Sequence, residues 1–147
     1  MQKQTSPALE ATECNMLALR QATRHASQLY DGHLAKTGLK GTQYSILSKL
    51  NRLGPLSINE LAKAMVMDRT TLGRAVRPLE RDKLLTIAAG EDARIRRLTL
   101  TAAGQAKVKA AAALWREAQK EFELAYGVPE AAELRAALRR VVAKTGA

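Results

Sequence analysis

The hydrophobic positions of residues 68–83 repeat with the period of an α-helix. Four apolar residues fall at i, i+3, i+4 and i+7, on one helical face: Leu72, Ala75, Val76 and Leu79. A second stripe, offset by roughly 200° at 3.6 residues per turn, carries hydroxyl and guanidinium groups: Thr70, Arg74, Arg77 and Arg81. The pattern predicts a helix with one buried and one exposed face, and Asp68 is suited to cap its first free amides.

A shorter amphipathic helix is predicted directly before this one. Ser57 and Glu60 form an S-x-x-E capping box. The apolar residues behind it share one face: Ile58, Leu61, Ala62 and Met65. The pattern breaks at residues 66–67 and restarts at Asp68. Two short amphipathic helices joined by a tight turn, the second with a basic outer face, are typical of a helix-turn-helix.

The residues after the second helix predict a β-hairpin. Residues 84–88 and 96–100 have the composition of strands, and residues 89–93 between them have the composition of a turn. A hairpin that directly follows a helix-turn-helix is the wing of a winged helix.

Longer helices are predicted on both sides of this unit. The first covers residues 10–35, and its length of roughly 37 Å is more than a small domain needs to cover its own core. Part of it is therefore expected to pack against another chain. Further helices are expected at residues 42–52 and 102–126, and Pro129 suits the first turn of a last helix.

The expected fold is mainly α with a small β-hairpin wing, in a single domain over residues 1–147. A winged helix-turn-helix occupies about residues 42–100. N- and C-terminal dimerisation helices flank it at about residues 10–36 and 102–144, and would pair two recognition helices across a two-fold axis.

Composition indicates the partner. The chain has 24 Lys and Arg residues against 14 Asp and Glu residues, a net charge of +10, which is typical of a protein that meets a polyanion. Its single cysteine excludes an intramolecular disulfide and suits a reducing compartment. The first residues do not resemble a secretory signal, and no apolar run reaches the ~20 residues of a membrane span, so a cytoplasmic location is expected.

The basic residues concentrate on the predicted recognition helix and wing. In a helix-turn-helix the second helix lies in the major groove of DNA, and wing arginines suit the negative potential of a narrow minor groove. The candidate DNA contacts are Ser57, Arg69, Thr70, Thr71, Arg74, Arg77, Arg94 and Arg96. The alternative is a winged helix used for protein contacts, which would more often carry apolar residues at positions 70, 74 or 77.

Several motifs agree with one known arrangement. They are Gly38-Leu39 with residues 42–47, Leu61-Ala62 with residues 67–72, and Arg77-Pro78-Leu79-Glu80-Arg81. The most specific is Asp92-Ala93-Arg94 followed by Leu100-Thr101-Ala102-Ala103-Gly104, a D-x-R…L-T-x-x-G pattern. With these motifs the chain resembles the MarR (multiple antibiotic resistance regulator) family of transcriptional regulators.

The resemblance implies an obligate homodimer that binds a palindromic operator in double-stranded DNA, usually as a repressor. It places Arg74 and Arg77 in the major groove with Thr70 and Thr71, and Arg94 in the minor groove. It also implies that Asp68 pairs with Arg94 and orients the wing.

Many MarR-type regulators release DNA when a small aromatic or phenolic acid binds between the dimer helices and the winged core. By that similarity, the candidate pocket residues are Met16, Arg20, Tyr30, Tyr44 and Trp115. The alternative for each of them is packing in the core or the dimer interface.

Cys14 raises the alternative of a thiol-based redox sensor. In the alignment with redox-sensing relatives, however, the sensor position falls on Met16, and Arg20 replaces the supporting tyrosine. An inert thiol is therefore expected, and a Cys14→Ser variant that stays bound to DNA in peroxide would identify a sensor. His25 and His33 do not form a metal site with Cys14, and neither a nucleophile–base pair nor a phosphate loop is found, so no metal, cofactor or enzymatic activity is expected.

Overall fold

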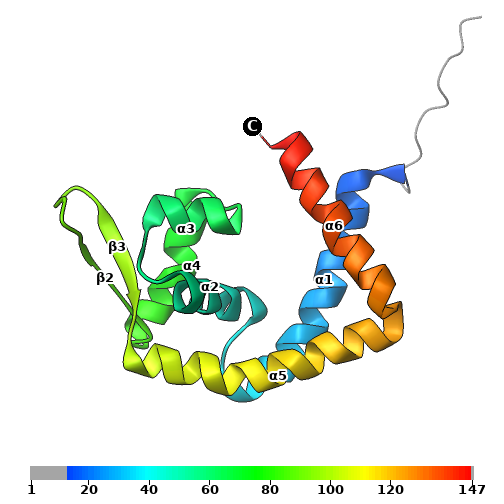
Figure 1. Ribbon diagram of the computed structural model, residues 1–147, viewed down its shortest axis with the longest axis horizontal. Helices are drawn as coiled ribbons and strands as arrows, with labels where there is room; N and C mark the ends of the chain where they lie inside the picture. Colours follow the sequence, from blue (N-terminus) through cyan, green and yellow to red (C-terminus); the bar gives the residue numbers. More distant parts are fainter. Residues whose placement is uncertain (1–12, 147) are drawn as a thin grey trace, which may run out of the picture.

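Helices dominate the computed structural model, which describes residues 13–146 (Figure 1). In chain order the elements are α1 (Asn15–Leu34), a 3₁₀ turn (Ala35–Thr37), α2 (Gly41–Leu53), β1 (Leu56–Ser57), α3 (Ile58–Met65), α4 (Arg69–Arg81), β2 (Leu85–Ala89), β3 (Arg96–Leu100), α5 (Ala102–Tyr126) and α6 (Val128–Thr145). The mainly α fold with a small β wing is confirmed. We call the part from α2 to β3 the winged core, and α1, α5 and α6 the flanking helices.

The predicted apolar stripes meet inside the winged core. Its largest fully buried side chains, each at most 1% exposed, are Ile46, Leu47, Leu61, Leu72, Val76, Leu79, Leu85 and Leu98. They come from α2, α3, α4 and both strands of the wing. Leu34, from the last turn of α1, is buried in the same cluster. The helical period of the sequence therefore identified the inward face of each helix in the core.

The sheet has a third strand that the sequence pattern did not reveal. The strand order is β1-β3-β2, and both pairings are antiparallel. β1 contains only Leu56 and Ser57, which lie opposite Leu98 and Arg97 of β3. Two residues are too few to show an alternating pattern, so only the tertiary contact with β3 makes them a strand.

A compact junction joins the winged core to α5. The Thr101 hydroxyl accepts a hydrogen bond from the Gly104 amide (3.0 Å) and donates one to the Lys83 carbonyl (2.7 Å). A Cβ atom on Gly104 would lie 2.0 Å from the Leu84 carbonyl oxygen. The L-T-x-x-G motif therefore caps α5 and lets its first turn contact the segment that ends the recognition helix.

The flanking helices extend away from the winged core. α5 runs along the bottom of Figure 1 from the wing to α6, and α1 packs against α5. The predicted start of the first helix, residues 10–12, lies outside the described residues. Within them, α1 begins at Asn15, and the Cys14 sulfur accepts a hydrogen bond from the Leu17 amide (3.5 Å) at its N-cap. None of the described helices is both long and apolar enough to cross a bilayer.

Candidate nucleic-acid interface

Asp68 caps the recognition helix α4, as the sequence predicts. Its carboxylate accepts hydrogen bonds from the amide (2.7 Å) and the hydroxyl (2.9 Å) of Thr71. The bond from the Thr71 amide, then that from its hydroxyl, hold the pKa of Asp68 below its ordinary value. The cap fixes where α4 begins and therefore which side chains occupy its first turn.

The outer face of α4 is polar and exposed. Arg69, Thr70, Thr71, Arg74 and Arg77 are all exposed, while the apolar stripe of the same helix is buried. Among residues 13–146, the ion pairs involve none of the α4 arginines. Their guanidinium groups are therefore available to an external anion, and the donors of a guanidinium match the acceptors on the major-groove edge of guanine.

Arg94 occupies the wing turn but does not pair with Asp68. Its Nε and Nη2 atoms each lie 3.2 Å from a carboxylate oxygen of Asp92. The Asp68 carboxylate is already bonded to Thr71. The expected Asp68–Arg94 pair is thus absent from the described structure, because each residue is bonded to a partner two or three positions away. The Arg94 side chain is 90% exposed, so the pair leaves it accessible.

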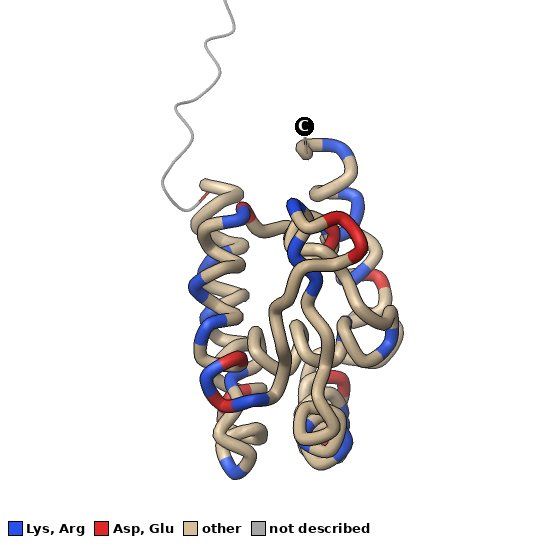
Figure 2. The backbone as a smooth tube through the Cα atoms, turned by 90° about the vertical axis from the view of Figure 1, so that its left-hand side faces the viewer, with Lys and Arg blue, Asp and Glu red and all other residues tan. Residues whose placement is uncertain are grey.

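The Asp92–Arg94 pair has an electrostatic consequence. The Arg94 side chain, and then the Arg94 amide, hold the pKa of Asp92 below its ordinary value. Figure 2, which views the molecule from the wing side, shows acidic and basic residues together in this turn. The wing turn therefore combines an exposed guanidinium with a carboxylate that fixes its direction.

The remaining candidate contacts differ in their exposure and in the hydrogen bonds that they already make within the chain. Arg96 is exposed on β3. Ser57 is half-buried, and its hydroxyl accepts from the Glu60 amide (3.1 Å) while its own amide donates to the Glu60 carboxylate (2.9 Å). The capping box is confirmed, and a DNA contact by Ser57 stays a prediction. Arg97, the neighbour of Arg96, donates to the Pro55 carbonyl (3.0 Å).

Two of the five candidate pocket residues line a common cavity. Tyr30 and Trp115 line a cavity of about 600 Å³ that is bordered by α1, α2, α4 and α5. Tyr44 is buried behind it and stacks on Trp115, with ring centroids 6.3 Å apart. The sequence did not indicate the polar side chains that join this lining, Lys40 among them, because the 3₁₀ turn between α1 and α2 brings them there.

Met16 and Arg20 do not line this cavity. Both are exposed on α1, and Met16 is 60% exposed. The α1 side chains that line this cavity begin at Thr23, and Met16 and Arg20 lie nearer the N-terminus of α1. Their assignment to a ligand pocket therefore stays a prediction.

The histidines and Cys14 are not gathered into a metal site in the described part of the chain. The His33 ring contacts Glu121 (2.5 Å) and Glu117 (3.8 Å), but no group of three or more His, Cys, Asp or Glu residues in the described chain is arranged to hold a metal ion. Cys14 is an exposed free thiol; the expected inert role and the redox-sensing alternative both stay predictions.

Comparison with known proteins identifies the family. The model of the MarR family matches residues 37–95. The M. tuberculosis transcriptional regulator MOSR, solved in complex with DNA, is 34% identical, with 92% of this chain and 100% of that chain covered and a TM-score of 0.80. A probable transcriptional regulator from Pseudomonas aeruginosa is 28% identical, with coverages of 88% and 98% and a TM-score of 0.80.

A more distant structure shows the same fold. Bordetella bronchiseptica BpsR, whose DNA binding is regulated by 6-hydroxynicotinic acid, is 21% identical, with 91% of this chain and 96% of that chain covered and a TM-score of 0.81. No curated protein matches the chain. With its winged core, its exposed arginine face and these similarities, the chain belongs to the MarR family of DNA-binding transcriptional regulators.

Proposed function

We propose that this regulator is a cytoplasmic homodimeric repressor that binds a pseudo-palindromic operator and leaves it when a small aromatic or phenolic ligand binds. The observation that carries the proposal is the outer face of α4, where arginines and threonines are exposed while Leu72, Val76 and Leu79 on the opposite face are buried. Arg74, Arg77, Thr70 and Thr71 would read the major groove from this face.

The wing supplies the second contact. Arg94 and Arg96 are exposed at and beside the wing turn, where they would meet the minor groove next to the major-groove site. The carboxylate of Asp92 directs the guanidinium of Arg94. Base contacts from α4 would provide sequence preference, and contacts from the wing would provide mainly affinity.

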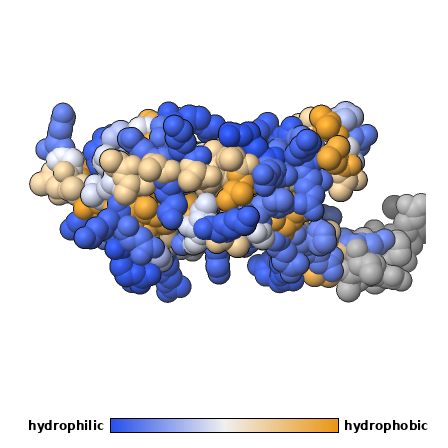
Figure 3. Space-filling model, turned by 90° about the horizontal axis from the view of Figure 1, so that it is seen from below, coloured by the Kyte–Doolittle hydropathy of each residue, from blue (hydrophilic) through white to orange (hydrophobic). Residues whose placement is uncertain are grey.

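The flanking helices support a dimer. α1, α5 and α6 border an apolar cleft of about 600 Å³, and exposed apolar side chains continue along α6 at Leu138, Val141 and Val142. A hydrophobic patch is also visible at the right-hand end of Figure 3, where α5 meets α6. A second copy of the chain would bury these surfaces and place two α4 helices on the two halves of one operator.

The cavity bordered by α2, α4 and α1 supports ligand control. Tyr30 and Trp115 offer aromatic surface, and Lys40 offers a charge for a carboxylate. Ala75 and Pro78 of the recognition helix also line the cavity, so a bound molecule would contact α4 directly. BpsR, which has this fold, is regulated by an aromatic acid.

Fluorescence anisotropy on the DNA upstream of the protein's own gene tests the DNA-binding part. Arg74→Ala should weaken binding to that DNA by about 1–3 kcal/mol and affect random DNA much less. Arg116→Ala, an exposed arginine on α5, is the matched control and should bind normally. Equal losses on both DNAs would make Arg74 a phosphate contact, and equal, strongly salt-dependent affinity of the unchanged protein for any DNA would refute sequence specificity.

A further inference from the structure

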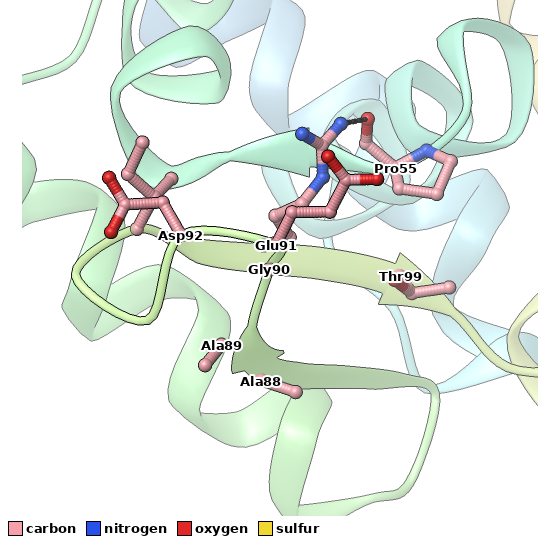
Figure 4. A pocket seen from close by; sticks show the side chains of 9 residues that line it. Pro55, Ala88, Ala89, Gly90, Glu91, Asp92 and Thr99 are labelled. Carbon is pink, nitrogen blue, oxygen red and sulfur yellow. Dashed lines mark hydrogen bonds between the residues drawn. The ribbon is translucent and has the colours of Figure 1, made fainter.

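Arg97 differs from the other wing arginines in what its guanidinium contacts. It lies on the central strand β3, opposite Ser57 of β1 and Ala88 of β2. Its Nη2 atom donates a 3.0 Å hydrogen bond to the carbonyl oxygen of Pro55, the dashed line in Figure 4. Arg94 bonds within the wing turn, whereas Arg97 joins the wing to a residue 42 positions earlier in the chain.

Gly90 provides the space for this contact. A Cβ atom on Gly90 would lie 2.8 Å from Cδ and 3.1 Å from Cγ of Arg97. The Gly90 amide donates to the Ile95 carbonyl (2.9 Å), which closes the hairpin. A side chain at position 90 would therefore force the stem of Arg97 to move, because that stem passes close to the Gly90 Cα atom.

Pro55 connects the wing to the helix-turn-helix through the elements that follow it in the chain. It directly precedes β1, and Ser57 at the end of β1 caps α3. α3 in turn packs against α4. Because β1 has only two residues, its backbone pairing with β3 is short, and the Arg97–Pro55 bond adds a side-chain contact beside it.

We propose that Arg97 is a positioning residue, which holds the wing at a set angle to the helix-turn-helix instead of binding DNA. The proposal rests on the DNA-binding function of the winged core. One N–H of its guanidinium is bonded to a carbonyl of the same chain, and in this proposal Arg97 affects DNA binding through the placement of Arg94 and Arg96. Gly90 contributes to the same contact, because its missing side chain leaves room for the side chain of Arg97.

Salt dependence of DNA binding separates this role from a phosphate contact. Removing a phosphate contact lowers the slope of log affinity against log salt by about one. Arg96→Ala should show that change. Arg97→Ala should lose roughly three- to tenfold in affinity at every salt concentration, the range of one hydrogen bond, with the slope unchanged. A slope lowered by about one in Arg97→Ala would overturn the proposal.

Gly90→Ala provides the sharper variant because it keeps the charge of Arg97. The new methyl group should displace the Arg97 side chain from Pro55, so affinity should fall as in Arg97→Ala. In an Arg97→Ala background the same Gly90→Ala change should have little further effect, since the contact that it disturbs is already gone. Normal binding by Gly90→Ala, or fully additive losses, would refute the coupling.

Hydrogen exchange in the DNA-free protein tests whether the Arg97–Pro55 contact holds the wing, and it needs no operator DNA. The amides of β1 and β3 should exchange faster in Arg97→Ala and Gly90→Ala than in the unchanged protein, and Arg96→Ala should leave them unchanged. If the protein showed no operator preference, this measurement would still decide the role of Arg97. Unchanged exchange in both variants would mean that Arg97 does not hold the wing.

Discussion

The winged core and the flanking helices bury their apolar residues to very different extents. In the winged core, leucines from three helices and from two strands are at most 2% exposed. In α6 only Ala131 is buried, while Leu138, Val141 and Val142 are 39–48% exposed. The winged core thus completes its hydrophobic core within one chain, whereas the flanking helices have apolar surface that only another surface can cover.

The polar groups of the two regions differ as well. The exposed arginines of α4 have no acidic partner in the described chain, which suits a site for an external polyanion. The flanking helices contain some polar pairs of their own: Tyr30 donates to Gln119, and Arg135 contacts Glu123 (3.3 Å). Burial and the nearby Glu123 carboxylate raise the pKa of Tyr30. One region of the described chain therefore presents unpaired positive charge, and the other presents exposed apolar surface.

The largest expected effect is on assembly. Leu138→Asp together with Val142→Asp should weaken self-association by about 3–5 kcal/mol, because each carboxylate would be buried without a partner in the proposed dimer. Sedimentation measured over a range of protein concentrations gives the dissociation constant. Leu53→Asp, the same change at an exposed leucine of the winged core, is the matched control. A stable dimer in the double variant would remove α6 from the interface.

A smaller effect is expected at the junction between the two regions. Gly104→Ala should lower the free energy of unfolding by about 1–3 kcal/mol, because the new Cβ atom would overlap the Leu84 carbonyl. Gly73→Ala is the control: it lies inside α4 with no atom near its Cβ position, and should raise the free energy of unfolding by about 0.5–1 kcal/mol. Urea unfolding measures both. Equal changes in the two variants would show that the close contact at Gly104 has no importance for stability.

The smallest effect concerns the cap of α4 in acid. The folded state lowers the pKa of Asp68 below 3.8, so its stabilising effect is complete above that pH and is lost as pH falls below it. Asp68→Asn keeps an acceptor for the Thr71 amide but does not titrate. Thermal unfolding between pH 7 and pH 3 should therefore show a smaller loss of melting temperature in the variant. Identical losses would mean that Asp68 contributes nothing to the acid sensitivity of folding.

Most of the winged core could be predicted from the sequence. The helical period identified the buried faces of α3 and α4, and the caps by Ser57 and Asp68 lie where the sequence predicted them. All of these features depend on residues within one or two turns of each other, which a pattern along the chain records directly. The exposed arginine face of α4 follows from the same period.

The candidate sites were predicted less completely. Met16 and Arg20 have suitable chemistry for a ligand, but they lie nearer the N-terminus of α1 than Thr23, where the α1 lining of the cavity that contains Tyr30 begins. Lys40 was not identified as a pocket residue, because nothing in its neighbourhood along the chain distinguishes it from a solvated lysine. Chemistry can be inferred from residue type, while orientation depends on how the helices pack.

The sequence by itself determined which segments are helices, which faces they bury, where the wing turns and which residues present positive charge. Only the tertiary structure decided that Leu56 and Ser57 pair with β3, that Arg94 bonds to Asp92 and not to Asp68, and that Arg97 reaches Pro55. The physical reason is the range of the interactions. Periodicity and capping act over three or four residues, whereas strand pairing and side-chain contacts between elements depend on positions that the whole fold brings together.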